Sequence, residues 1–597
     1  MKLTNLKIIN FRNFRCLSIP LNGNTVIVGE NRVGKSNLIE ALRLILDPSL
    51  PDAKRQLQVS DFWDGCSINS SETPTVEVHV DFDIEDSAPS ILALMNDFRR
   101  PTEPSKARLS YKFRVTPPTE GASIDVGALS INDFEFITYG GDRENVRITA
   151  RQRRALGFYL LPALRDAESQ LGSYRYSPLR PLIEDALKNV SQEDISNVSS
   201  LLDSATDQLG NIASIQNLSK SLTENIARLA AGNNDVDAAL RFSSAEPGSL
   251  FRSLSLYIDG GKRSLNDASL GSANVMLIAL MLQHFEWEKR AKERQFTLLC
   301  IEEPEAHLHP QFQRSVFSKL ISNDTDTALV ITSHSPTIAA VTPLRSIVNL
   351  KKASDGSTVG FSLAKLPVSG SEIDDLEGYL SATRSELLFA KGVIFVEGDA
   401  EEKLIPVFAD AMGINLDDLG VTVCNVVGTN FKPYVVLAEY LGLQHVCITD
   451  WDPLDGSNQP LGIERAIKLA EVKESIRSKQ SMKFNRSQFD FEPHSFREWA
   501  GQNYGIFLNE NTFETELVNS PCRTALLEVL EAQEFGSIRM NRIQNWKAGG
   551  PVPPEQLLAM ISDVGKGRFS AQLSRSDKKL SPPNYIASAI IKITECL

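Results

Sequence analysis

A glycine-rich segment near the N-terminus has the residue types and spacing of a phosphate-binding loop. Gly29-Glu30-Asn31-Arg32-Val33-Gly34-Lys35-Ser36 matches G-x-x-x-x-G-K-[ST] and connects an apolar strand expected at 25–28 to an apolar helix expected at 37–46. In such a loop the backbone N–H groups and the helix dipole hold phosphate, the lysine reaches the β- and γ-phosphates, and the serine ligates Mg²⁺. The predicted nucleotide-binding residues are Gly29, Asn31, Gly34, Lys35 and Ser36, with Ser36 also a metal ligand.

Three later segments have the chemistry to complete this nucleotide site. An apolar run ends in Glu302 and Glu303, and we assign the first to Mg²⁺ with its water shell and the second to polarising the attacking water. Ser269-Leu270-Gly271-Ser272 opens an apolar helix with small residues, which suits Ser269 and Gly271 to phosphate contacts. A further strand ends at His334. Without the phosphate loop, a solvated acidic strand end would be the better interpretation of the two glutamates.

Two apolar strands in the last third of the chain also end in carboxylates. Glu397 follows an expected strand, and Glu401 comes four residues later at the start of a helix. Asp450 and Asp452 follow a second strand, and their spacing of two places both side chains on one face. Carboxylates held this close repel one another and raise one another's pKa, so the arrangement favours divalent cations as counter-charge.

Two residues downstream could join this acidic site. Glu514 lies in the acidic segment 512–517, and Gly565-Lys566-Gly567 places a lysine on a loop that we expect to be flexible. A helix-capping lysine is the competing interpretation of Lys566.

The order of the first group of motifs resembles the ATPase head of the ABC/SMC class. The phosphate loop, the signature-like segment 269–273, Glu302-Glu303-Pro304 and the switch histidine His334 follow one another as they do in that class. The resemblance implies a head-to-head dimer in which the signature of one subunit closes over ATP held by the other. The chain has Glu302 where aspartate is usual and Ser-Leu-Gly-Ser-Ala where Leu-Ser-Gly-Gly-Gln is usual. His307 and His309 are interpreted as the loop at the subunit contact, with metal binding as the alternative.

The acidic strand ends resemble a Toprim domain, and an ABC-type head followed by such a domain resembles the OLD (overcoming lysogenization defect) nucleases over nearly the whole chain. The resemblance implies ATP-regulated, two-metal cleavage of DNA in defence against phage. It implies Mg²⁺, or Mn²⁺ in the Toprim site, and a homodimer or higher homo-oligomer, with a helicase or other defence-system protein as a candidate partner. The residues that match the family's metal ligands are Glu397, Glu401, Asp450, Asp452 and Glu514, and Lys566 matches its catalytic lysine.

We expect an α/β fold in which an ABC-type ATPase head, with two lobes and mixed sheets, precedes a Toprim domain. The expected parts are the head at 1–178 and 241–375, a helical dimerisation insertion at 179–240, and the Toprim nuclease domain at 380–597. Antiparallel strands of the head are expected at 75–82, 109–115 and 134–139.

Composition excludes several classes of protein. The chain has 597 residues, of which 42% are hydrophobic and 23% charged, so it is a folded multidomain protein rather than a disordered or fibrous one. Its net charge of −13 argues against a protein that coats nucleic acid or anionic membrane, so DNA must be bound through local basic patches or bound metal. Seven scattered cysteines without a C-x-x-C pair indicate a reducing compartment. No apolar run is long enough to span a membrane, so we expect a cytoplasmic protein without membrane contact.

Two other functions compete with a nuclease. An SMC-like ATP-dependent DNA clamp with an inactive Toprim domain would need heptad-patterned coils far longer than the helical insertion. A topoisomerase or primase would need a strand-attacking tyrosine or a zinc module, and neither stands out in the sequence. A metal-dependent DNA endonuclease regulated by ATP is therefore the favoured function.

Overall fold

The computed structural model forms two compact units, a larger one of residues Met1–Ala150 with Gln313–Leu597 and a smaller one of Arg151–Phe312. The unit boundaries fall inside α4 (Ala150–Ala155) and α11 (Pro310–Ser322). Among the helices that the structure describes, none is long and apolar enough to cross a membrane. The described residues are 1–66, 74–117, 129–163, 177–188, 190–229, 254, 256–258, 262–264, 269–291, 294–322, 327–380, 384–452, 460–484, 493–576 and 580–597.

The larger unit begins with an antiparallel sheet in the order β2-β1-β4-β6-β5, with β7 paired to β6. Its inward side chains alternate with outward ones, as expected for a sheet with one buried face. The three strands predicted in this region are confirmed as β4, β6 and β7. The strands are β1 (Lys2–Phe11), β2 (Phe14–Pro20), β4 (Val76–Asp83), β5 (Arg99–Arg100), β6 (Glu103–Val115) and β7 (Phe134–Gly140).

A second sheet of the larger unit holds the phosphate loop. Strand β3 (Thr25–Gly29) is parallel to β12 (Thr327–Ser333) on one side and to β13 (Ile347–Lys352) on the other, and β14 (Thr358–Ser362) pairs antiparallel with β13. All five residues of β3 are buried, which explains its continuous apolar run. Helix α1 (Lys35–Leu46) follows the loop and packs its apolar side into the core. The fold therefore presents the loop at the carboxyl end of a central strand.

The last part of the larger unit contains a parallel sheet in the order β16-β15-β17-β18. Alternate residues of β15 and β17 pack into one core with α14 and α24, while Phe395 faces Tyr434 of α16. The strands are β15 (Gly392–Val396), β16 (Val421–Asn425), β17 (Gln444–Thr449) and β18 (Ile506–Leu508). Because the strands are parallel, their carboxyl ends share one edge, and that edge carries Glu397, Asp450 and Asn509.

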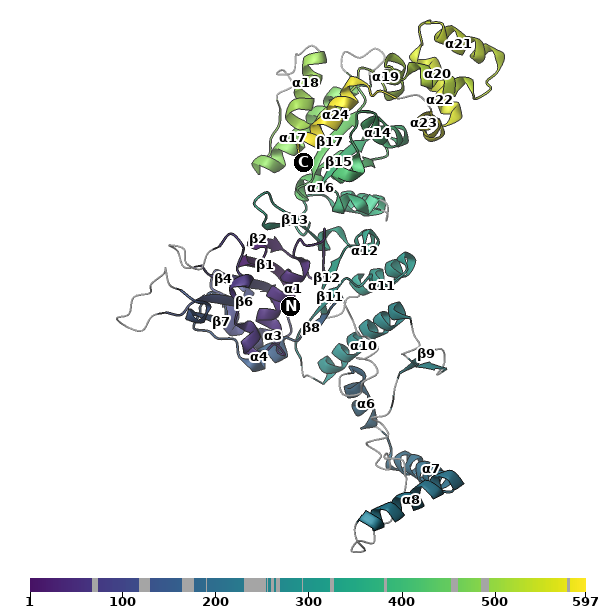
Figure 1. Ribbon diagram of the computed structural model, residues 1–597. Helices are drawn as coiled ribbons and strands as arrows, with labels where there is room; N and C mark the ends of the chain where they lie inside the picture. The colour runs from purple at the N-terminus through teal and green to yellow at the C-terminus, as the bar shows by residue number, and fades with distance from the viewer. Residues whose placement is uncertain are drawn as a thin grey trace. The chain divides into compact units, whose positions relative to one another are not determined.

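Helices surround this parallel sheet and continue beyond it (Figure 1). Those that accompany the sheet are α14 (Asp399–Ala411), α16 (Lys432–Tyr440), α17 (Leu461–Ser478), α18 (Pro493–Tyr504) and α24 (Asn584–Glu595). A group of helices between β18 and α24 comprises α19 (Phe513–Asn519), α20 (Arg523–Glu531), α21 (Ser537–Lys547), α22 (Pro554–Val564) and α23 (Lys566–Ser574). The short helices are α2 (Asp52–Arg55), η1 (Val59–Asp61), α3 (Pro89–Met95), η2 (Asn96–Phe98), η4 (Ile131–Asp133), α12 (Pro336–Val341), η7 (Leu344–Ser346), α13 (Gly370–Tyr379), η8 (Arg384–Phe389) and α15 (Leu416–Leu419).

The smaller unit pairs β8 (Phe158–Leu161) in parallel with β11 (Thr297–Glu302). Glu288 of α10 is buried and connects the helix to this strand pair: it accepts a hydrogen bond from Tyr159 of β8 at 3.0 Å and forms an ion pair with Arg294 at 2.8 Å. The remaining elements are α6 (Leu179–Leu187), α7 (Gln192–Gly210), α8 (Ala213–Leu229), β9 (Tyr257–Ile258), β10 (Arg263–Ser264) and α10 (Leu270–Arg290). The predicted α/β class is confirmed in both units.

Candidate functional site

The phosphate loop contains a backbone position, Gly34, that only glycine can occupy. Gly34 has φ 92°, and a Cβ there would lie 2.1 Å from Asn13 Nδ2. Lys35 is buried, and its Nζ donates to the carbonyl oxygens of Gly29 (3.0 Å) and Glu30 (2.9 Å). The same Nζ lies 3.3 Å from His334 Nδ1, so the structure brings the loop lysine and the predicted switch histidine together. Asn31 and Ser36 are exposed beside them.

The other predicted nucleotide residues belong to the smaller unit. Glu302 ends β11, and Glu303 follows it with a left-handed φ of 43°. Ser269 caps α10 by accepting a hydrogen bond from Ser272 N at 3.2 Å. A Cβ on Gly271 would lie 2.5 Å from the His307 carbonyl oxygen, so this glycine permits close packing. Helix capping and packing therefore account for part of the small-residue pattern at 269–272.

The two acidic strand ends of the parallel sheet meet. Glu397 Oε1 accepts a hydrogen bond from Asp450 N at 3.0 Å and another from the Thr449 hydroxyl. Arg465 of α17 joins the strand ends from the side, donating to Glu397 Oε1 at 2.7 Å and to Asp452 Oδ2 at 2.8 Å. Glu397 thus lies in direct contact with the segment that follows β17.

Asp450 and Asp452 do not share a face through strand alternation, and the prediction that they would is wrong. Strand β17 ends at Thr449, and Asp452 has a left-handed φ of 46°, so the two aspartates lie in the turn after the strand. Asn509 holds this turn by donating to Asp450 Oδ1 at 2.5 Å and accepting from Trp451 N at 2.8 Å. Asn509 is itself a polar residue at a strand end, so the signal that identified Glu397 could have found it.

Lys566 does not lie on a flexible loop as predicted. It is the first residue of α23, preceded by Gly565 with φ 87°, and its Nζ forms an ion pair with Glu514 Oε1 at 2.8 Å. A cation at a helix N-terminus is opposed by the helix dipole, so nearby negative charge must stabilise it there. Burial lowers the pKa of Lys566, but the pairing with Glu514 outweighs burial and raises that pKa overall.

Negative charge exceeds the positive charge available to balance it at this edge. Burial, followed by repulsion from Glu397 and Glu401, raises the pKa of Asp450 to about 8. Burial, followed by the charges of Glu514 and Glu397, raises the pKa of Glu401 to about 7. Burial also raises the pKa of Glu397, although Arg465 opposes the shift. Ionising these carboxylates together is therefore unfavourable, and a cation at this edge would lower that cost.

In the described ranges, no three His, Cys, Asp or Glu side chains form a ready-made metal cage. Arg465 lies between Glu397 and Asp452, and Lys566 is paired with Glu514. The donors are all carboxylate oxygens, which fit Mg²⁺ or Mn²⁺ better than a softer metal. The chemistry of the donor set therefore fits a hard divalent cation.

The raised carboxylate pKa values predict that the metal-free protein loses stability as pH rises. Unfolded carboxylates titrate near pH 4, whereas native Asp450 and Glu401 titrate near 8 and 7, so the native state binds more protons between those limits. This contribution is complete below about pH 4 and is lost as pH rises through 7 to 8. Thermal melting in EDTA at pH 5, 7 and 8.5 measures it.

The control for this titration is Glu401→Gln, which removes one of the two groups. We expect the melting temperature of this variant to fall less than that of the wild type between pH 5 and 8.5. An identical pH dependence in the two proteins would show that Glu401 is ionised normally.

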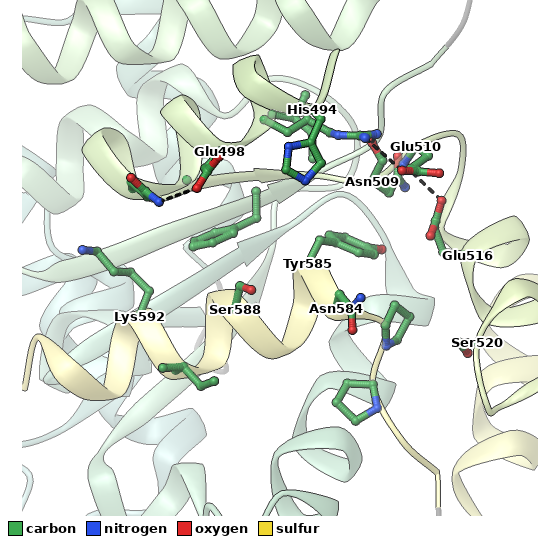
Figure 2. A pocket seen from close by; sticks show the side chains of 18 of the residues that line it. His494, Glu498, Asn509, Glu510, Glu516, Ser520, Asn584, Tyr585, Ser588 and Lys592 are labelled. Atoms are coloured by element: carbon green, nitrogen blue, oxygen red, sulfur yellow. Dashed lines mark hydrogen bonds and ion pairs between the residues drawn. The ribbon is translucent and has the colours of Figure 1, made fainter. Parts of the chain in front are cut away.

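A cleft of about 850 Å³ adjoins the acidic edge (Figure 2). Helix α18 contributes His494 and Glu498, and α24 contributes Tyr585, Ser588 and Lys592. Asn509 also lines the cleft, so the residue that holds Asp450 forms part of its wall. Burial, with the charges of Asp450 and Glu401, raises the pKa of the Tyr585 hydroxyl well above its usual value.

Comparisons with known proteins match both parts of the chain. The AAA ATPase domain family matches residues 1–136 and 158–339, and the overcoming lysogenization defect protein-like TOPRIM domain matches 388–452. The chain is 23% identical to "Endonuclease GajA" of Bacillus cereus over 87% of its own length and 88% of the relative. It is 26% identical to "OLD nuclease" of Thermus scotoductus over 66% of this chain and 71% of the relative.

The chain is also similar to a solved structure, the C-terminal region of the Burkholderia pseudomallei OLD protein, with 35% sequence identity and a TM-score of 0.30. The match covers 35% of this chain and 98% of the chain in that structure. The family matches confirm the predicted combination of an ATPase head and an OLD-like Toprim domain. The chain therefore belongs to the AAA ATPase domain family and carries an OLD-like Toprim domain at residues 388–452.

Proposed function

We propose that the Toprim domain of this ATP-dependent nuclease cleaves DNA by a two-metal mechanism. The observation that supports it best is the contact between the two acidic strand ends, with Asp450 N 3.0 Å from Glu397 Oε1. The pKa values of buried Asp450 and Glu401 are raised, so ionising these carboxylates is unfavourable without added positive charge. Divalent cations would supply that charge. The proposed metal ligands are Glu397, Glu401, Asp450, Asp452 and Glu514, and the proposed metals are Mg²⁺ or Mn²⁺.

The metal ions and the side chains around them would have different roles in the hydrolysis. Metal ions at this edge would lower the pKa of the attacking water and stabilise the leaving oxygen. Lys566, held toward the acids by Glu514 at 2.8 Å, would stabilise the charge that develops on the phosphate oxygens. Asn509 would keep Asp450 in the orientation that presents its other oxygen.

The ATPase head would bind ATP through the phosphate loop. Gly29, Asn31, Gly34, Lys35 and Ser36 would surround the phosphates, and Ser36 with Glu302 would hold Mg²⁺. Glu303 would polarise the attacking water, and Ser269, Gly271 and His334 would contact phosphate. The proximity of Lys35 Nζ and His334 Nδ1, at 3.3 Å, supports the assignment of His334.

Assembly as a homodimer or higher homo-oligomer in the cytoplasm is part of the proposal. Helices α7 and α8 expose large apolar side chains, as a helical dimerisation surface would. These side chains are Val198 and Leu201 of α7 and Leu218 and Leu222 of α8, and Ile212 between the two helices is also exposed. The OLD-like Toprim domain supports a role in phage defence, with a helicase or other defence protein as a partner.

Removing the metal is expected to stop DNA cleavage. Supercoiled plasmid incubated with the protein and Mg²⁺ or Mn²⁺ should be nicked or linearised, and EDTA should abolish this cleavage, with ATP present or absent.

The substitution Lys566→Met should reduce DNA cleavage on the order of 10²-fold or more, because a fixed positive charge at the phosphate is lost.

The matched control is Lys468→Met, which removes an exposed lysine that pairs with Glu464 on α17. That variant should cut at the wild-type rate. Cleavage that persists in EDTA would refute the metal mechanism, and wild-type cleavage by Lys566→Met would refute the role of the lysine.

A further inference from the structure

Arg465 is enclosed by oxygen atoms from both acidic strand ends. Its guanidinium donates to Glu397 Oε1 at 2.7 Å, Asp452 Oδ2 at 2.8 Å and the Asp450 carbonyl at 3.2 Å. It also donates to the Thr449 hydroxyl at 2.5 Å, and only 13% of its side chain is exposed. The planar fork of arginine allows it to hold two carboxylates at once, which the single ammonium of lysine does less well.

Each carboxylate at the strand ends is anchored by only one of its two oxygens. Glu397 Oε1 accepts three side-chain or backbone donors, from Thr449, Asp450 N and Arg465. Asp452 is held through Oδ2 by Arg465, and Asp450 through Oδ1 by Asn509. Within the described ranges, no hydrogen bond reaches the second oxygen of any of these three carboxylates.

This pattern favours ligands that bind a cation through a single oxygen. Glu397 Oε1 is already filled by three donors, so Glu397 can offer a metal only Oε2. Mg²⁺ requires a compact octahedron, whereas Ca²⁺ takes six to eight oxygens and readily uses both oxygens of one carboxylate. Holding one oxygen of each acid therefore disfavours Ca²⁺.

Resting on the metal mechanism proposed above, we propose that Arg465 is a positioning residue that sets metal selectivity. It fixes Glu397 and Asp452 as one-oxygen ligands and so favours small octahedral cations over Ca²⁺. The role depends on the two-armed geometry of the guanidinium and not only on its charge.

Arg465→Lys tests this geometry because it keeps the positive charge. Isothermal titration of the full-length, EDTA-treated protein with MnCl₂ and separately with CaCl₂, without DNA, measures both affinities. We expect Mn²⁺ affinity to fall roughly 10- to 100-fold while Ca²⁺ affinity changes less than about threefold. Arg477→Lys, on the same helix and paired with the distant Glu439 at 2.8 Å, is the matched control and should leave both affinities unchanged.

Thr449→Val provides a second test if Arg465→Lys does not fold. It removes one donor from Glu397 Oε1 with little change of shape, so it should shift the selectivity toward Ca²⁺ in the same direction but less. Equal losses for both metals in these variants, or unchanged affinities, would overturn the role of Arg465. A wild-type protein that binds neither cation would instead refute the metal mechanism itself.

Discussion

Replacing Asp450 with asparagine is expected to reduce DNA cleavage on the order of 10³-fold while leaving ATP hydrolysis unchanged. Asp450 lies at the junction of the two strand ends, where its backbone N–H bonds Glu397 and its Oδ1 accepts from Asn509. Asparagine has nearly the same shape, so the turn persists, but it lacks the negative charge that a divalent cation requires. Plasmid nicking and phosphate release from ATP, measured on one preparation, test both halves of this expectation.

The matched control for this substitution is Asp410→Asn, which changes an exposed aspartate of α14 away from the strand ends. It should cut plasmid at the wild-type rate. Plasmid cleavage that survives Asp450→Asn would mean that the catalytic carboxylates lie elsewhere in the chain.

Replacing Lys35 with alanine is expected to reduce ATP hydrolysis on the order of 10²-fold or more. Lys35 Nζ is held at the phosphate loop by the Gly29 and Glu30 carbonyls. The lysine of this motif reaches the β- and γ-phosphates of a bound nucleotide. Phosphate release at saturating ATP measures the loss. Plasmid cleavage by the same variant, with and without ATP, gives the direction in which nucleotide regulates the nuclease.

Lys54→Ala, at an exposed lysine of the short helix α2, is the control for this second substitution and should hydrolyse ATP normally. A melting comparison with the wild type separates lost catalysis from lost folding, since Lys35 is buried. Wild-type ATP hydrolysis by a folded Lys35→Ala protein would refute the phosphate-binding role of the loop.

Elements that are defined by a pattern of neighbouring residues could be predicted from the sequence. The continuous apolar run of β3 and the glycines after it define a strand, loop and helix without reference to the rest of the chain. The same reasoning placed Glu397 and Asp450 at strand ends, and parallel pairing of β15 with β17 then brings these ends to one edge.

Residues that act across the fold could not be predicted in the same way. Arg465 follows Asp452 by 13 residues in the first half of helix α17, and its ion pairs depend on how that helix packs against the sheet. Asp450 and Asp452 do not alternate on a strand, because β17 ends at Thr449, three residues before Asp452. Lys566 begins a helix because Glu514, 52 residues away, compensates the unfavourable dipole.

The position of β3 in its sheet determines when the phosphate loop can form during synthesis. Its neighbours β12 and β13 begin at Thr327 and Ile347, so about 300 residues must be translated before this strand acquires a partner. At roughly 5 to 20 residues per second, the ribosome needs about 15 to 60 s for that stretch. The antiparallel sheet of β1, β2, β4, β6 and β7 is complete by Gly140 and can fold early. The apolar strand β3 stays unpaired until β12 and β13 have been synthesised. The nascent chain therefore needs protection from aggregation in this interval, and the nucleotide site is among the last parts of the head to appear.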